Sequence, residues 1–147
     1  ASAYIGAKTA TEEKDYSFDA EQFGRLLGRA FQIRDDMLDF DMSSIGGKGF
    51  GNDIKEKKIT LPLIFLLESL NESDRERLLG FIAREDKTER EIKALIEAVC
   101  ESDCLDKSEE EVRRYSLLAK EHLQLLPDNE YRKKLEELTD YLVLRKL

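Results

Sequence analysis

The sequence predicts an all-α protein in which residues 1–147 form a single helical domain, a bundle of antiparallel helices. Apolar residues recur at helical spacing along most of the chain, and the alternation and paired turns that are typical of strands are absent. Several segments also begin with a polar residue that is followed three positions later by Glu or Gln, a pattern that starts helices. At 147 residues the chain is long enough to bury the core of one domain.

The first well-marked helix is expected over residues 19 to 41, and Asp19 with Gln22 resembles a capping box at its start. Its apolar side chains fall on one broad half when they are placed at 100° per residue. The glycine-rich stretch IGGKGFGND at residues 45 to 53 predicts a loop after this helix.

Thr60 followed by Pro62 predicts the start of the next helix, because proline is well placed in a first helical turn. The run LPLIFLL at residues 61 to 67 indicates that this helix is buried on most sides. The remaining helices are expected over residues 74 to 84 behind Ser73 and Glu76, 89 to 100 behind Thr88 and Glu91, 104 to 126 before Pro127, and from a cap at Asp128 to the end of the chain.

Charge and cysteine content narrow the class of protein. The chain has 24 basic and 32 acidic residues and a formal net charge of −8, which argues against binding to a nucleic-acid backbone. Cys100 and Cys104 fit a reducing cytoplasm better than a disulfide-built secreted scaffold. Their spacing could hold half a metal site, but with His122 as the single histidine we favour buried thiols. The apolar run at 61 to 67 is too short to span a bilayer, so we expect no integral membrane protein.

The stretch FQIRDDMLDF at residues 31 to 40 places Asp35, Asp36 and Asp39 on one face of the first helix. Like charges at this spacing destabilise a helix, and the macrodipole disfavours them near its C-terminal end. The patch is either a solvated face of an acidic protein or half of a Mg²⁺ site, since Mg²⁺ is commonly held by one or two carboxylates together with substrate phosphates.

Lysines follow this patch at the distance that a phosphate half-site would need. Lys48 lies in the glycine-rich loop, and Lys55, Lys57 and Lys58 come soon after it. An EF-hand beginning at Asp39 is excluded, because Ser44 stands where glycine is required and Phe50 where a bidentate glutamate is required. A P-loop is excluded because GGKGFG lacks both the spacing and a preceding strand.

The segments GRAFQIRDDMLDF and GKGFGNDIKEKKITLPLIFLL resemble the second aspartate-rich region of the trans-type polyprenyl diphosphate synthases. The shared order is F-Q-x-x-D-D-x-x-D, then G-K-x-x-G-x-D, then K-x-T-L-P, and a looser similarity extends to YLVLRKL at the end of the chain. The resemblance implies the isoprenoid synthase fold, an all-helical bundle around a deep cavity, of which this chain would be the C-terminal portion.

The resemblance also implies a Mg²⁺-dependent prenyltransferase that condenses isopentenyl diphosphate with an allylic diphosphate such as farnesyl diphosphate. Its full-length form is expected to be a homodimer, and the cysteine usage predicts that it is cytoplasmic. Carried over residue by residue, the implied site comprises Asp35, Asp36 and Asp39 for the metal-bound diphosphate, Gln32, Lys48 and Lys58 for the allylic diphosphate, Phe31 for the isopentenyl side, and Asp53 as a supporting acid behind them. For Phe31 and Asp53, simple packing and loop capping are equally good explanations.

The chain also departs from the family pattern, because the first aspartate-rich motif and its arginines have no counterpart in it. Lys8 and Thr9 are too close to FQIRDD to be the family's Lys-Thr substrate motif, and the chain begins without methionine in mid-pattern. We therefore expect the C-terminal fragment of a longer synthase, inactive by itself. The alternative is a non-catalytic helical subunit, regulatory or scaffolding, that kept the fold.

Overall fold

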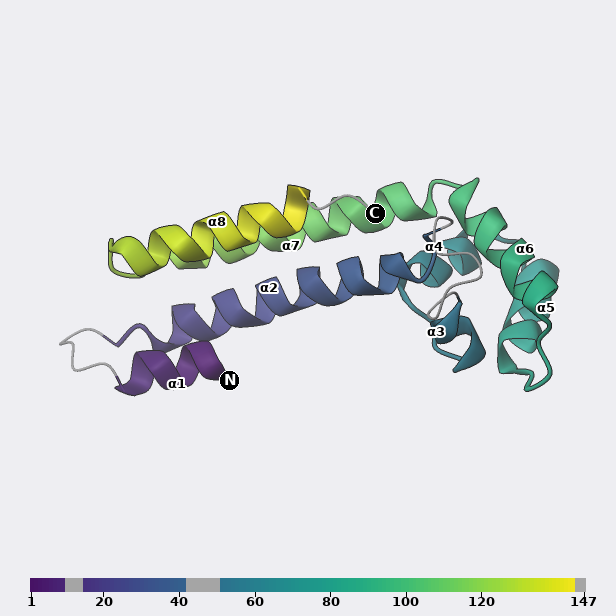
Figure 1. Cartoon of the computed structure of the whole chain (residues 1–147), viewed down its shortest axis with the longest axis horizontal. Helices are drawn as coiled ribbons and strands as arrows, with labels where there is room; N and C mark the ends of the chain where they lie inside the picture. The colour runs from purple at the N-terminus through teal and green to yellow at the C-terminus, as the bar shows by residue number, and fades with distance from the viewer. Residues whose placement is uncertain (10–14, 42–50, 145–147) are drawn as a thin grey trace. The chain divides into compact units, whose positions relative to one another are not determined.

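The computed structural model describes residues 1–9, 15–41 and 51–144, and within these residues it contains eight α-helices and no strand (Figure 1). The all-α prediction is thereby confirmed. The helices are α1 (Ser2–Thr9), α2 (Ser17–Leu38), α3 (Asn52–Lys55), α4 (Leu61–Ser69), α5 (Glu72–Ala83), α6 (Glu89–Cys100), α7 (Cys104–Gln124) and α8 (Glu130–Leu144).

The start of α2 differs from the prediction by two residues. The helix begins at Ser17, whose backbone N–H donates to the Asp15 carboxylate at 2.9 Å. The capping box predicted at Asp19 is therefore wrong, because Asp19 lies inside the first turn and its carboxylate meets the His122 ring at 3.0 Å instead. A carboxylate in a first helical turn still interacts favourably with the macrodipole.

The starts of α4 and α6 agree with the prediction, and α6 has the complete capping box between Thr88 and Glu91. Two other caps were placed wrongly. Asn71 caps α5 by accepting from the Asp74 N–H, and Asn129 caps α8 by accepting from two N–H groups at 3.0 Å. In both cases an asparagine one or two residues from the predicted cap supplies the oxygen, and the two side chains are equally good at this position.

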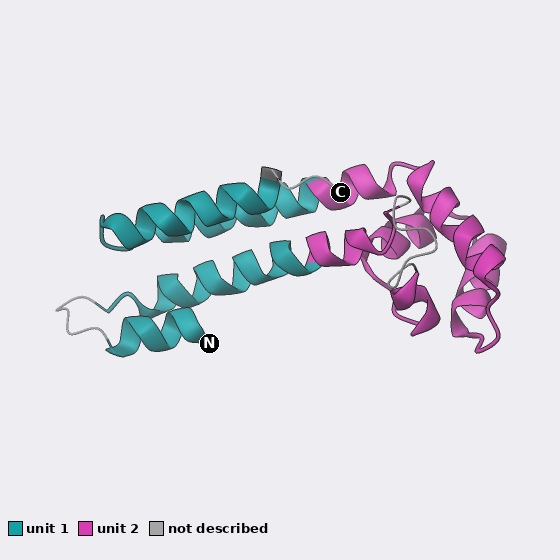
Figure 2. Ribbon diagram, in the orientation of Figure 1, with its two compact units in different colours: residues 1–32, 110–146 teal, residues 33–109, 147 magenta. Residues whose placement is uncertain are grey.

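The chain divides into two compact units, each described by itself (Figure 2). The first unit comprises residues 1–32 and 110–146, and the helices α2 and α7 contribute to both units. Its core contains Phe23, Ala119 and Leu123, against which leucines of α2 and α8 pack. An ion pair between Lys120 and Asp140 joins α7 to α8, which returns antiparallel beside it (Figure 1).

The second unit comprises residues 33–109. Helix α6 contributes one apolar stripe to its core, with Ile92, Leu95, Ile96 and Val99 buried at the spacing that places side chains on one face. Phe40, Ile54, Leu63, Ile82 and Cys104 complete the buried cluster. Both cysteines are free thiols, and burial raises the pKa of Cys100, whose Sγ donates to the Phe40 carbonyl at 3.3 Å.

Helix α3 is a single turn that ends in an unusual backbone conformation at Lys57, where φ is 62°. The Lys57 N–H donates to the Ile54 carbonyl at 3.2 Å, and the Lys58 N–H donates to the Asp53 carbonyl at 2.8 Å. Helices commonly end in this way with a left-handed residue, which is usually glycine because other residues are strained there. The arrangement brings Lys58 back beside Asp53.

We expect Lys57→Gly to raise the free energy of unfolding by up to about 1 kcal/mol, since glycine removes the left-handed strain. Urea denaturation followed by circular dichroism measures the effect. Lys55→Gly, inside α3 at ordinary backbone angles, should instead lower stability by roughly 0.5–1 kcal/mol. Lys57→Gly also removes the ion pair between Lys57 and Glu85. The variant Glu85→Gln removes the same ion pair without changing the backbone, so its effect on stability is subtracted from that of Lys57→Gly. Equal destabilisation by both glycine variants would contradict the strain at Lys57.

Candidate functional site

The acidic patch occupies the end of α2. Asp35 is exposed, Asp36 is half-buried, and Asp39 follows the last helical residue, Leu38, in a half-buried position. Phe31 and Gln32 lie on the same helix with exposed side chains, Phe31 at 53%. Phe31 is therefore not part of the buried core of the described residues.

Both carboxylate oxygens of Asp39 accept backbone N–H groups of α3. One oxygen accepts the Asn52 backbone N–H at 2.8 Å, and the other accepts the Asp53 backbone N–H at 3.1 Å. These are two of the N–H groups that have no partner within α3 itself. Asp39 therefore fixes the start of α3 against the end of α2.

Burial raises the pKa of the Asp39 carboxyl, and the nearby Asp53 carboxylate acts in the same direction. The two backbone N–H donors and Lys55 oppose this shift, and burial outweighs them. The surroundings of Asp39 therefore disfavour its ionised form, and a cation nearby would stabilise that form.

The Lys58 and Asp53 side chains form an ion pair. The Lys58 ammonium lies 3.0 Å from an Asp53 oxygen and 2.8 Å from a Glu56 oxygen. Hydrogen bonds to Glu56 first and then Asp53 raise the pKa of Lys58, so the lysine stays charged at neutral pH. Asp53 thus connects the other two residues. Its backbone N–H donates to the Asp39 carboxylate, and its side-chain carboxylate accepts from the Lys58 ammonium.

The donor chemistry of the patch suits Mg²⁺ only in part. Asp35 and Asp36 offer the hard oxygen ligands that Mg²⁺ prefers. Asp39 would reach an ion most readily through water, because both of its oxygens already accept N–H groups. Within the described residues, no three His, Cys, Asp or Glu side chains are arranged to hold a metal ion. Lys48, predicted to bind the diphosphate, lies outside the described residues.

Arg34 is a residue of this segment that the sequence analysis missed. Its side chain is 2% exposed, and its guanidinium pairs with the Glu109 carboxylate of α7 at 3.2 Å. A buried charge needs such a partner, and breaking one commonly costs several kcal/mol. Its burial could have been predicted from helical spacing, because Arg34 lies four residues after Ala30 and three before Met37, and both of these residues are buried.

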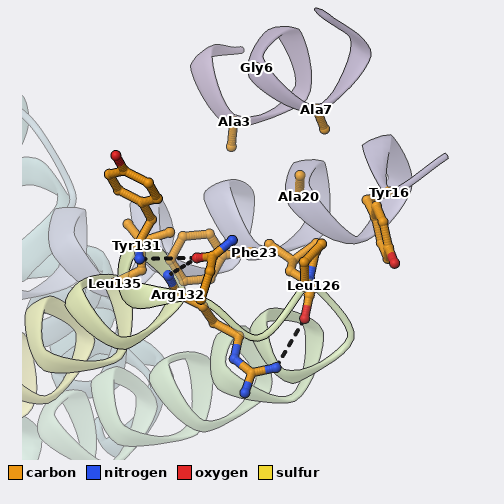
Figure 3. Close-up of a pocket in the computed structure, with 12 residues that line it drawn as sticks. Ala3, Gly6, Ala7, Tyr16, Ala20, Phe23, Leu126, Tyr131, Arg132 and Leu135 are labelled. Atoms are coloured by element: carbon orange, nitrogen blue, oxygen red, sulfur yellow. Dashed lines mark hydrogen bonds between the residues drawn. The ribbon is translucent and has the colours of Figure 1, made fainter. Parts of the chain in front are cut away.

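A separate cavity of about 490 Å³ lies in the first unit between α1, the start of α2 and the connection from α7 to α8 (Figure 3). None of the predicted site residues lines it. Ala3, Ala20 and Phe23 present apolar side chains, and Arg132 is committed to the Leu126 carbonyl and to Asp128.

No helix among the described residues is long and apolar enough to cross a membrane.

Comparison with known proteins decides the family. The model of the polyprenyl synthetase family matches residues 1–99, a range that contains every predicted site residue. The chain belongs to this family. The resemblance found in the sequence is confirmed, and Asp35, Asp36 and Asp39 lie within the matched range.

Curated relatives of this polyprenyl synthetase chain include enzymes of different product lengths. It is 35% identical over 127 residues to a short chain isoprenyl diphosphate synthase of Methanothermobacter thermautotrophicus, covering 85% of this chain and 38% of the relative. It is 30% identical to an octaprenyl diphosphate synthase of Haemophilus influenzae, covering 94% of this chain and 41% of the relative. The chain therefore spans about two fifths of the length of these relatives.

Solved structures extend the match to nearly the whole polyprenyl synthetase chain. The geranylgeranyl pyrophosphate synthase of Bacteroides thetaiotaomicron matches with a TM-score of 0.83 at 27% identity, over 98% of this chain and 46% of that one. The decaprenyl diphosphate synthase of Rhodobacter capsulatus matches with a TM-score of 0.84 at 27% identity, over 97% and 45%. The predicted isoprenoid synthase fold is thereby confirmed.

Proposed function

We propose that the chain forms the C-terminal part of a Mg²⁺-dependent prenyltransferase that condenses isopentenyl diphosphate with an allylic diphosphate such as farnesyl diphosphate. The observation that supports this most strongly is that one family match covers the α2 aspartates, α3 and Lys58 together. We further propose that the complete enzyme is a homodimer, as the resemblance implies, and that it is cytoplasmic, in keeping with the free thiols of Cys100 and Cys104.

In this reaction the allylic C–O bond breaks, diphosphate leaves with the electron pair, the double bond of isopentenyl diphosphate attacks the carbocation, and a proton is then lost. Mg²⁺, when bound, neutralises the charge that develops on the leaving diphosphate. We assign Asp35 and Asp36 to holding that ion, and Asp39 to holding it through water. Asp39 also fixes α3, and so fixes where Asp53 and Lys58 stand.

The remaining assignments concern the substrates. Lys58, together with Gln32 and Lys48, would bind the allylic diphosphate, and Phe31 would line the isopentenyl side. Asp53 orients Lys58 at 3.0 Å. Catalysis in such a site is mostly positioning and electrostatic stabilisation, so each of these residues acts by where it is held.

We expect the 147-residue chain alone to yield no product when it is incubated with radiolabelled isopentenyl diphosphate, farnesyl diphosphate and excess Mg²⁺. The family reaction uses two facing aspartate-rich motifs, and this chain supplies the second. A fusion protein that places the chain behind the N-terminal part of the Haemophilus influenzae relative should incorporate label.

Two outcomes would contradict this proposal. Product from the chain alone would show that the first motif is dispensable. A fusion protein that unfolds cooperatively but makes no product would favour the alternative, a non-catalytic helical subunit that kept the fold. The unmodified relative serves as the positive control for both measurements.

A further inference from the structure

The Lys58 ammonium is held between two carboxylates that differ in how firmly they are fixed. Asp53 has a side chain that is 19% exposed, its backbone N–H donates to Asp39, and it belongs to α3. Glu56 follows the last residue of α3, and its side chain is 61% exposed. Asp53 therefore has one well-defined position, whereas Glu56 can turn away into solvent.

The charges at this point do not favour an anion. Lys58 contributes one positive charge, and its two partners contribute two negative charges, so the group is net negative. A diphosphate that is to bind Lys58 must first compete with a carboxylate for the ammonium N–H groups. Because the lysine side chain is 57% exposed, such an exchange requires no opening of the core.

We propose that Glu56 is a positioning residue that occupies Lys58 until a diphosphate displaces it, while Asp53 keeps the ammonium oriented throughout. This inference rests on the proposed function, because it takes Lys58 as a diphosphate ligand. Glu56 thereby weakens the binding of free diphosphate, because the diphosphate must compete with its carboxylate for the Lys58 ammonium.

The test is to titrate the 147-residue chain with inorganic pyrophosphate without Mg²⁺ and to follow the backbone amide resonances of residues 52 to 58 by NMR. Glu56→Gln keeps the shape of the side chain and removes its charge. We expect it to tighten pyrophosphate binding by about five-fold at low ionic strength, the size of one exposed ion pair, and less as salt is added.

Glu85→Gln is the matched control, because Glu85 pairs with the neighbouring Lys57 in the same way and is equally easy to neutralise. It should change the affinity less than two-fold. Introduced into a Lys58→Gln background, Glu56→Gln should also have less than a two-fold effect, since a purely structural or long-range role would not depend on Lys58.

The outcomes separate this inference from the proposed function. If Lys58→Gln weakens pyrophosphate binding but Glu56→Gln leaves it unchanged or weakens it, the role of Glu56 is wrong and that of Lys58 stands. If Lys58→Gln has no effect, the diphosphate role of Lys58 fails as well. The absence of any saturable response in both the unmodified chain and Glu56→Gln would also overturn the inference.

Discussion

Replacing Asp35 or Asp36 by alanine in an active fusion protein is expected to lower turnover by about a hundredfold or more. Each change removes a carboxylate that we assign to the ion beside the leaving diphosphate. Because that ion acts on charge that develops in the transition state, the loss should fall mainly on kcat. Steady-state incorporation of labelled isopentenyl diphosphate at saturating Mg²⁺ measures it.

Asp86→Ala is the matched control for these variants, because it removes an aspartate of the second unit whose side chain is 90% exposed. Its turnover should equal that of the unmodified fusion protein. Relief of the repulsion between Asp35 and Asp39 should leave the Asp35 variant as stable as its parent, within about 0.5 kcal/mol. Near-normal turnover in both variants would mean that the patch is only a solvated face.

Replacing Gly51 by alanine is expected to lower the free energy of unfolding by about 2–5 kcal/mol, the sum of left-handed strain and overpacking. Gly51 has φ of 62°, and an added Cβ would lie 2.4 Å from Cγ2 of buried Ile92. Both costs arise in the core of the second unit. Urea denaturation of the chain, followed by circular dichroism, gives the change.

Gly80→Ala is the control for Gly51→Ala, since Gly80 lies inside α5 and nothing stands within 4 Å of its added Cβ. It should raise stability by roughly 0.5–1 kcal/mol, because alanine is the better helix former. The pair therefore predicts opposite signs for the same chemical change. An unchanged midpoint for Gly51→Ala would show that α6 does not pack closely against this residue.

Local patterns predicted those parts of the fold that neighbouring residues determine. The box at Thr88 and Glu91 is local, so the start of α6 could be read directly. The cap of α5 was misplaced because Asn71 and Ser73 are both good caps, and only the backbone decides between them. Asp19 was misread for another reason, since its partner His122 lies 103 residues away in the sequence.

The candidate site shows the same division between local and distant information. Helical spacing predicted Asp35, Asp36 and Asp39 on one face of a helix, but α2 ends at Leu38 and Asp39 lies just beyond it. The family resemblance assigned Asp53 and Lys58 to the same site. The partners of these side chains could not be predicted. Glu56 and Lys58 contact each other on either side of Lys57, whose left-handed conformation is unusual for lysine and so could not be predicted from the residue type.

Because Asp39 accepts two backbone N–H groups of α3, its presence in a homologue indicates something different from the presence of Asp35. Asp39 has a structural reason to persist in a homologue that has lost its chemistry, since α3 depends on it for its start. Exposed Asp35 has no such reason that the structure shows. When degenerate members of the family are sorted into enzymes and pseudoenzymes, retention of the last aspartate of D-D-x-x-D should therefore count for little, and retention of the first should count for much.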